Sequence, residues 1–294
     1  MAVRLDEPDL AAPADAPRAG LPGGFAQLTQ SGPALIGAVL VGFWVLMAIL
    51  APWISPYDPS ANDYQALGNP LPSAAHWLGT DQLGRDLLSR VIWGARTVLT
   101  VAPIAVAIAY VVGCFMGLAA GYFGGWVDAV LSRIADIVLS FPVIILYIII
   151  IANFGASALN IVIAVTFTAA PGIMRIVRGL TLEIKQLDYV AAAQTRGESA
   201  LYIMLVEILP NARGPLIVDA CLRMGYTTIA IGVLGFLGLG LPPPTPDWGG
   251  MVKDAYAMLS VWPHMALIPC FAISSLVVGF NLLADGLREL GLDG

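Results

Sequence analysis

The sequence predicts an all-α integral membrane protein with six transmembrane helices. Of its 294 residues, 58% are hydrophobic and only 12% are charged, whereas about a quarter of the residues of an ordinary soluble domain are charged. Uncharged runs long enough for a helix to cross about 30 Å of hydrocarbon recur along the chain. These runs do not alternate with the two-residue period of a barrel strand, and a helix satisfies its own backbone hydrogen bonds in lipid.

The positions of the charged residues delimit six spans. No charged residue occurs from 137 to 174, a stretch about twice as long as one span needs, so it must fold back. The turn-forming residues 153–157 divide it. The predicted spans are Pro33–Ile54, a second within Thr97–Val127 that ends near Gly121, then 137–152, 158–174, Pro215–Leu239 and Met265–Ala284.

Lysine and arginine residues predict the orientation, because they are more frequent in cytoplasmic flanks. With the N-terminus inside, nine of them lie on the cytoplasmic side and four outside, so both termini are expected in the cytoplasm. Residues 1–32 lack the apolar segment of a signal peptide, and their content of Ala, Pro, Gly and acidic residues predicts a disordered cytoplasmic tail. Residues 33–96 would form the first helix and an external segment. Residues 97–290 would form a core with a long cytoplasmic segment, 175–214.

Several function classes are disfavoured by composition and by missing motifs. A net charge of −6 with only two lysines does not suit a nucleic-acid binder. No GxxxxGK[ST] loop is present to hold a nucleoside triphosphate, so ATP hydrolysis is not expected of this chain, and no catalytic residue is assigned. The cysteines and histidines have no metal-ligand spacing; we interpret them as apolar and interfacial residues and expect no metal site. They are Cys114, Cys221, Cys270, His76 and His264.

Two ionisable residues, Asp219 and Arg223, lie inside the fifth predicted span. They are four residues apart on one helical face and can therefore pair with each other. Ionisable residues within a membrane often mark a substrate path. Two interpretations stay open: a mutually neutralised pair packed against a neighbouring helix, or a part of the translocation path.

The cytoplasmic segment predicts a helix, a bend and a second helix. Asp188 can cap a short alanine-rich helix. Gly197 can end that helix in a left-handed conformation, and the second helix then continues to Pro210. This pattern resembles the EAA loop of ATP-binding-cassette importer permeases, which reads Glu-Ala-Ala, three residues, Gly and an Ile-Leu-Pro-like ending. Ala191 stands where that family usually has Glu.

The resemblance implies that the loop 188–211 within this segment couples the chain to a cytoplasmic ATPase. The residues that it assigns to the coupling are Asp188, Tyr189, Ala191, Ala192, Ala193, Gly197, Ile208, Leu209 and Pro210.

The external segment predicts the start of the second helix. Thr80 or Asp81 can cap that helix, and Asp81/Arg85 and Asp86/Arg90 have the spacing of i,i+4 pairs. Residues 76–96 are similar to the N-terminal signature of the C-type subunit of the dipeptide, oligopeptide and nickel permease family. Further similarities to that family occur at 121–128, 141–142 and 236–249. The segment would give structural support or dock an external binding protein.

Two other patterns concern packing. Glycines 113, 117 and 121 form a stripe of small residues that allows close helix contact in lipid. The proline-rich residues 242–248 predict a stiff external turn, with Trp248 and Trp262 as aromatic anchors at the membrane interface.

The family resemblance implies a type I importer permease fold in a bacterial inner membrane, with spans two to six as a five-helix core and the first span as a peripheral helix. It also implies four partners: a homologous second permease in a heterodimer, two cytoplasmic ATP-binding subunits and an external solute-binding protein. The partner ATPases would bind ATP and Mg²⁺, whereas this chain would need no cofactor. The sequence does not define the solute. A stand-alone channel or an ion-coupled secondary transporter is the alternative, and a membrane-anchored enzyme is disfavoured.

Overall fold

The computed structural model describes residues 31–290, and within this range its regular structure is helical apart from one isolated bridge between Thr80 and Asp86. The predicted disordered tail therefore lies almost wholly outside the described residues. Five of the described helices are long and apolar enough to cross a membrane. They are α2 (Gly32–Ile54), α3 (Leu87–Phe123), α6 (Ala158–Ile184), α9 (Arg213–Phe236) and α11 (His264–Glu289).

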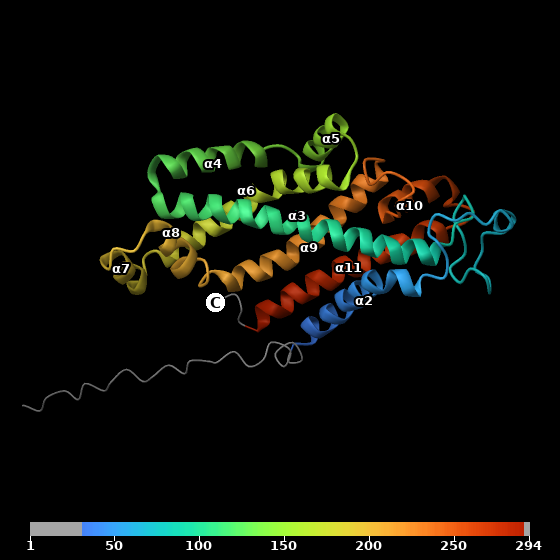
Figure 1. Ribbon diagram of the computed structural model, residues 1–294, viewed down its shortest axis with the longest axis horizontal. Coiled ribbons are helices and arrows are strands. Elements are labelled where there is room, and N and C mark those ends of the chain that lie inside the picture. The colour runs from blue at the N-terminus through green and yellow to red at the C-terminus, as the bar shows by residue number, and fades with distance from the viewer. Residues whose placement is uncertain (1–30, 291–294) are drawn as a thin grey trace, which may run out of the picture.

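The remaining described helices are shorter. They are η1 (Ala66–Gly68), α4 (Gly125–Leu139), α5 (Val143–Phe154), α7 (Asp188–Thr195), α8 (Ala200–Tyr202), η2 (Ile203–Ile208), α10 (Trp248–Ala255) and η3 (Tyr256–Met258). The long helices run side by side along the molecule (Figure 1), with α7, α8 and η2 at one end and α10 and residues 55–86 at the other.

The third span differs from the prediction. A continuous helix was expected at 137–152, but α4 and α5 meet at 86°. Pro142 stands at the N-cap of α5; it has no N–H to continue the helix, and it disfavours helical geometry at Phe141. Counted as one broken span, the pair gives the predicted total of six.

Ion pairs with α4 explain why α6 is longer than the predicted span 158–174. Arg175 on α6 contacts Asp136, and Arg178 makes two hydrogen bonds with Asp128, one of them 2.6 Å long. Because α4 supplies these counter-charges, α6 continues through both arginines to Ile184.

The glycine stripe brings α3 and α6 into close contact, as predicted. A Cβ atom added at Gly117 would lie 2.6 Å from the Cβ of Val177, and one at Gly113 would lie as close to that of Ile173. The two helices are neighbours along their length (Figure 1). Only a residue without a side chain allows this distance, so the stripe fixes the spacing of the pair.

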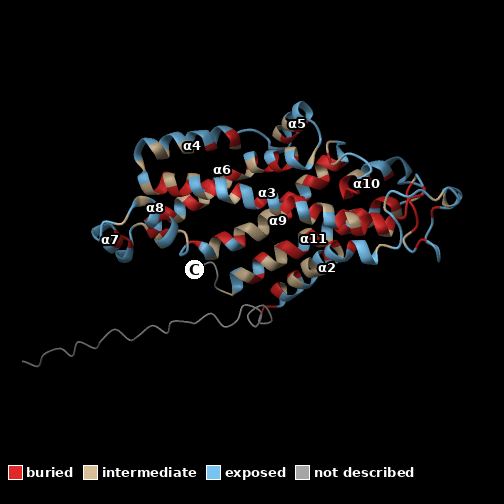
Figure 2. Cartoon of the chain, in the orientation of Figure 1, coloured by how far each residue is buried: buried red, intermediate tan, exposed pale blue. Residues whose placement is uncertain are grey.

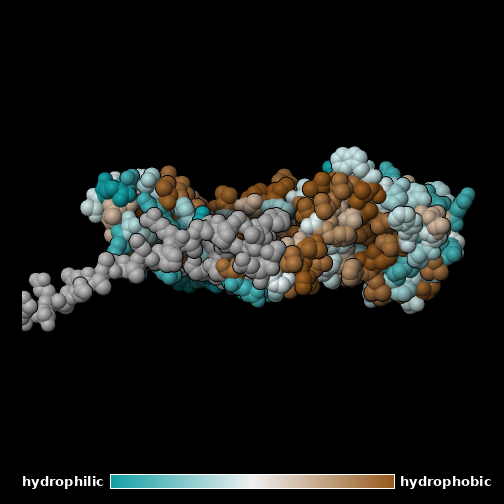
Figure 3. Space-filling view, turned by 90° about the horizontal axis from the view of Figure 1, so that it is seen from below, coloured by the Kyte–Doolittle hydropathy of each residue, from teal (hydrophilic) through white to brown (hydrophobic). Residues whose placement is uncertain are grey.

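The first span lies at the edge of the bundle and packs along α11 (Figure 1). Gly37 approaches the backbone of Gly279 and Leu283, and the Trp44 Nε1–H donates to Ser275 Oγ at 3.0 Å. Buried and exposed residues alternate along each of the long helices (Figure 2). Apolar side chains gather over the middle of the visible face, and more polar ones predominate at the end that holds residues 55–86 (Figure 3).

Candidate functional site

The predicted coupling segment lies between α6 and α9 at one end of the bundle (Figure 1). It spans 185–212 rather than 175–214, because α6 continues to Ile184 and α9 begins at Arg213. The expected helix, bend and second helix are present as α7 followed by α8 and η2, and η2 is a π-helical turn. Asp188 is not the cap: Leu187 occupies the N-cap and Asp188 is the first helical residue, where its charge still favours the positive end of the helix dipole.

Gly197 forms the bend in the way that the sequence predicts. Its φ is +79°, a conformation that costs a residue with a Cβ about 1–2 kcal/mol. The Gly197 N–H donates to Gln194 O at 3.0 Å, and the Glu198 N–H donates to Ala193 O at 3.2 Å. This pair of hydrogen bonds closes a helix that ends at Thr195, is capped by Arg196 and is followed by the left-handed Gly197.

One face of α7 is buried and the other is exposed. Val190 and Ala193 are 0% exposed and pack with Ile203 and Ile208 of η2 in a cluster that includes Val177 of α6. Leu209 is half-buried. The other assigned residues are exposed: Asp188, Tyr189, Ala191, Ala192, Gly197 and Pro210. The segment is therefore a knob, residues 188–210, whose inner face is fixed to the bundle and whose outer face is free within the described chain.

Asp219 and Arg223 form the predicted pair on α9. The Arg223 Nε–H donates to Asp219 Oδ2 at 2.6 Å. The hydroxyl of Tyr110 on α3 also donates to Asp219, and Arg223 Nη1 donates to Ala169 O on α6 at 3.5 Å. This polar clamp joins three long helices, as the packing interpretation expects. A place along the translocation path stays a prediction.

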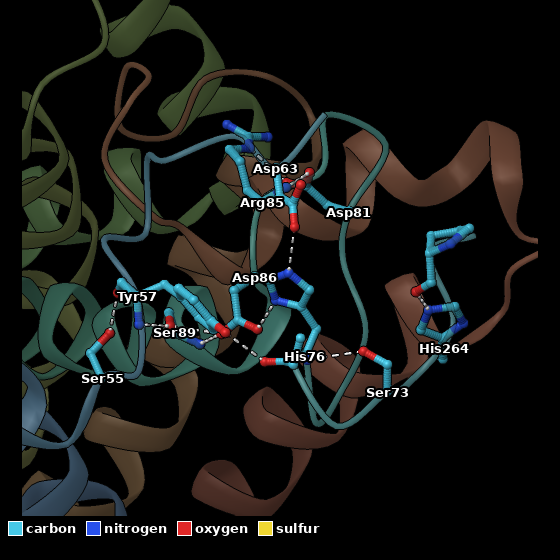
Figure 4. Close-up of polar contacts among 12 residues, drawn as sticks. Ser55, Tyr57, Asp63, Ser73, His76, Asp81, Arg85, Asp86, Ser89 and His264 are labelled. Carbon is cyan, nitrogen blue, oxygen red and sulfur yellow. Dashed lines mark hydrogen bonds and ion pairs between the residues drawn. The ribbon is translucent and has the colours of Figure 1, made fainter. Parts of the chain in front are cut away.

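Residues 55–86, which the sequence predicts to be external, fold around a buried histidine (Figure 4). His76 Nδ1 lies 2.9 Å from Asp86 Oδ1, and Nε2 lies 3.3 Å from Asp63 Oδ2. Burial lowers the pKa of His76, but its hydrogen bonds with Asp86 and then Asp63 raise the pKa further, so the net shift is upward. The interpretation of His76 as an isolated interfacial residue is therefore wrong. Asp63 is 13 residues away and the intervening chain has no regular spacing that indicates the contact.

Two details of the predicted start of α3 are also wrong. Asp86, rather than Thr80 or Asp81, is the N-cap. Its carboxylate turns back toward the first turn of the helix and so does not pair with Arg90. Arg90 Nε instead lies 3.4 Å from Asp81 Oδ2. The Asp81/Arg85 pair is confirmed, with 2.7 Å between Oδ2 and Nε.

Trp248 is a core residue and not the interfacial anchor that the sequence predicts. It is 0% exposed, and its Nε1–H donates to Val91 O at 2.9 Å. Asp247 caps α10 by accepting from Gly249 and Gly250 at 3.2 Å, and this turn directs the indole inward. Gly94 on α3 leaves the space for the ring, because a Cβ at that position would collide with it. Trp248 thereby fastens α10 to α3.

Comparison with known proteins decides the family. Residues 109–290 match the family model described as binding-protein-dependent transport system inner membrane component. Residues 25–72 match the N-terminal transmembrane domain of oligopeptide transport permease C. The chain belongs to this family of importer permeases. Its all-helical fold is the type I importer permease fold, as the sequence resemblance implies, and the permease is a multi-pass inner membrane protein.

Similar proteins cover most of the permease. It is 40% identical over 257 residues to the glutathione transport system permease protein GsiD of Pectobacterium atrosepticum, which corresponds to 86% of this chain and 85% of that protein. It is 42% identical to GsiD of an Escherichia coli strain, over 87% of this chain and 84% of that protein. It is 39% identical to the dipeptide transport system permease protein DppC of Alkalihalophilus pseudofirmus, over 90% of this chain and 87% of that protein.

Proposed function

We propose that this permease forms half of the translocation pathway of an ATP-driven importer for short peptides or a related small solute such as glutathione. It would act as a heterodimer with a homologous permease, beside two cytoplasmic subunits that bind ATP and Mg²⁺ and an external solute-binding protein. The names of its relatives support the solute class. The chain itself binds no cofactor in this proposal.

The observation that carries the proposal is the construction of the knob. Its buried residues Val190 and Ala193 fix it to α6, while Ala191 and Ala192 present a smooth outer face. Small exposed side chains allow a partner surface to approach the helix closely. A rigid connection of this kind passes a push on the knob to α6, and the clamp of Tyr110, Asp219 and Arg223 extends it to α3 and α9.

The energy source in this proposal is differential binding. ATP and the loaded binding protein must each prefer one of two permease conformations, because a ligand with equal affinity for both shifts neither population. The knob and residues 55–86 lie at opposite ends of the bundle (Figure 1). This arrangement supports a cytoplasmic ATPase at one end and a binding protein at the other.

Reconstitution tests the proposal. The permease alone in liposomes should neither hydrolyse ATP nor accumulate radiolabelled glutathione or dialanine. Co-expression with P-loop ATPases and a homologous second permease from the same organism should give a complex that co-purifies and hydrolyses ATP. Accumulation by the isolated chain along an ion gradient would instead support the stand-alone channel or the ion-coupled carrier. ATP hydrolysis by the pure chain would refute the assignment.

A further inference from the structure

An apolar groove of about 630 Å³ lies between α2, α3 and α11, toward the end of the bundle that holds residues 55–86. Its volume falls within the range of about 300–1,000 Å³ that is usual for small-molecule sites. Aromatic and aliphatic side chains from all three helices form its walls. They include Phe43 and Met47 of α2, Leu88 and Ile92 of α3, and Leu267 and Phe271 of α11.

The groove exists because α2 changes its neighbour along its length. In its first half α2 touches α11 directly: a Cβ atom added at Gly37 would lie 2.4 Å from the backbone nitrogen of Leu283. Further along, Ala48 of α2 is buried in the cluster that contains Leu87 of α3. Toward the end with residues 55–86, α2 and α11 therefore form two walls of a groove and α3 forms its floor.

The lining offers an occupant almost no hydrogen-bonding group. Among the lining side chains that the structure describes, only Trp44 and His264 carry a ring N–H. The Trp44 Nε1–H donates to Ser275 Oγ at 3.0 Å, and His264 Nε2 donates to Pro70 O at 3.1 Å. A polar solute would leave its own groups unpaired there, at a cost of about 2–7 kcal/mol for each amide or hydroxyl. The occupant must therefore be apolar along its length.

The bilayer supplies molecules of this kind, because α2 and α11 are both long and apolar enough to span it. From His264 to Phe271 the groove follows α11 for about two turns, or about 10 Å at 1.5 Å per residue. One leaflet contributes about half of the 30 Å of hydrocarbon, so the groove has the length of a chain from a single leaflet. A helix of a partner protein would instead contact α11 across the whole membrane. The outward face of α2 is apolar and exposed over its length, as lipid contact requires, at Ile36, Val39, Phe43, Leu46 and Leu50.

We propose that this groove binds one acyl chain of a phospholipid from the leaflet on the side of residues 55–86, which is the outer leaflet in the predicted orientation. The gain over bulk lipid is packing, since three helices contact the bound chain and packing drives association inside a membrane. Water does not fill the groove in place of the chain, because an apolar cavity stays dry. The bound lipid holds the second half of α2 against the core. The site requires only that the chain spans a membrane, and it does not depend on the solute or on an ATPase.

Native mass spectrometry of the full-length permease tests the site. The permease is washed in detergent to remove loosely held lipid and is then titrated with palmitoyl-oleoyl phosphatidylethanolamine. The wild type should bind one phospholipid more tightly than any further one. Met47→Trp places a larger ring in the wall of the groove and should weaken this first binding by about tenfold or more, which corresponds to about 1.4 kcal/mol. Leu46→Trp is the matched control, because Leu46 is 58% exposed and lies outside the groove; it should bind like the wild type.

A polar side chain in the wall provides a second, independent variant. Leu267→Asn should weaken the first binding in the same way, because its amide has no partner beside an acyl chain. Val278→Asn should not, since Val278 is also exposed on α11 but lies outside the groove. Size-exclusion chromatography and thermal unfolding verify that each variant is folded before its lipid binding is compared.

Three results would overturn the proposal. The first is a wild type without a distinct tightly bound lipid, and the second is equal binding by Met47→Trp and Leu46→Trp. The third is a lipid that the isolated chain binds but that the complex with the second permease excludes, because the groove would then belong to the partner permease.

Discussion

Replacing Gly197 by valine should separate membrane assembly from ATPase coupling. The Gly197 φ of +79° disfavours any side chain, although an added Cβ would meet no atom within 4 Å. The cost is therefore conformational, about 1–2 kcal/mol, and not a steric collision. That energy lowers the population of the native bend about 5–30-fold against alternative geometries. The second helix of the knob is then aimed differently, while α6 and α9 are untouched.

A matched control is available in the same region of the chain. Gly179 on α6 also has no atom within 4 Å of an added Cβ, and its φ is not positive. Gly179→Val therefore makes the same chemical change without the strain. Both variants should insert and assemble with the second permease. Only Gly197→Val should lose ATPase co-purification and solute-stimulated ATP hydrolysis.

Ala191→Glu provides the complementary test, because it restores the residue that the family usually has. Ala191 is exposed on α7, so a longer side chain meets no core and should be tolerated in both assays. If Gly197→Val matched the wild type in both assays, the bend would not be the coupling element. The assignment of the knob would then rest on family membership alone.

Three further predictions concern orientation, pH and packing. A single cysteine at Ser60 should react with an impermeant thiol reagent only from outside, and one at Gln186 only from the cytoplasmic side. The reverse pattern would invert the predicted topology. Because Asp86 and Asp63 raise the pKa of His76, its stabilisation of residues 55–86 is fully present below about pH 6.5 and is lost as the pH rises through the raised value. The protection of this segment against hydrogen exchange, relative to the intrinsic exchange rate at each pH, should fall over that range; constant protection, or the same fall in His76→Gln, would contradict this. Gly117→Leu should destabilise the permease by about 1–3 kcal/mol, measured by thermal unfolding in detergent, because α3 must move away from α6. The control Gly42→Leu should leave the stability unchanged, because a Cβ at that position meets no atom within 4 Å. Equal stability of the two variants would refute the argument.

The spans could be predicted because hydropathy depends only on the local sequence. The first span ends at Ile54 in both the prediction and the structure. The predicted end of a span was wrong where charged residues far apart in the sequence form ion pairs. Arg175 and Arg178 indicate a helix end near the membrane surface, but their partners on α4 are 39 and 50 residues away. No local pattern reports a pairing over that distance.

In the candidate sites, too, contacts between residues close in the sequence were predicted and contacts between distant residues were not. The bend at Gly197 and the pairing of Asp219 with Arg223 were predicted, because each rests on hydrogen bonds within about five residues. Tyr110 was missed as the third member of the clamp, since it lies 109 residues from Asp219. Trp248 was assigned to the interface for the same reason, because its hydrogen-bond partner Val91 is 157 residues away.

These long-range contacts determine how a force applied to the knob by the proposed ATPase partner would be transmitted. Close packing at Gly113 and Gly117 prevents α3 and α6 from sliding past each other, and the clamp holds α9 to both. We therefore expect α3, α6 and α9 to move as one body, with changes of shape confined to the breaks: the 86° bend between α4 and α5 and the turn at 237–247. Together with Ala156, that turn lines a polar cavity of about 270 Å³ at the end of the bundle opposite the knob. If the knob binds an ATPase as proposed, a movement that begins there should therefore change the shape of this cavity at the opposite end of the bundle.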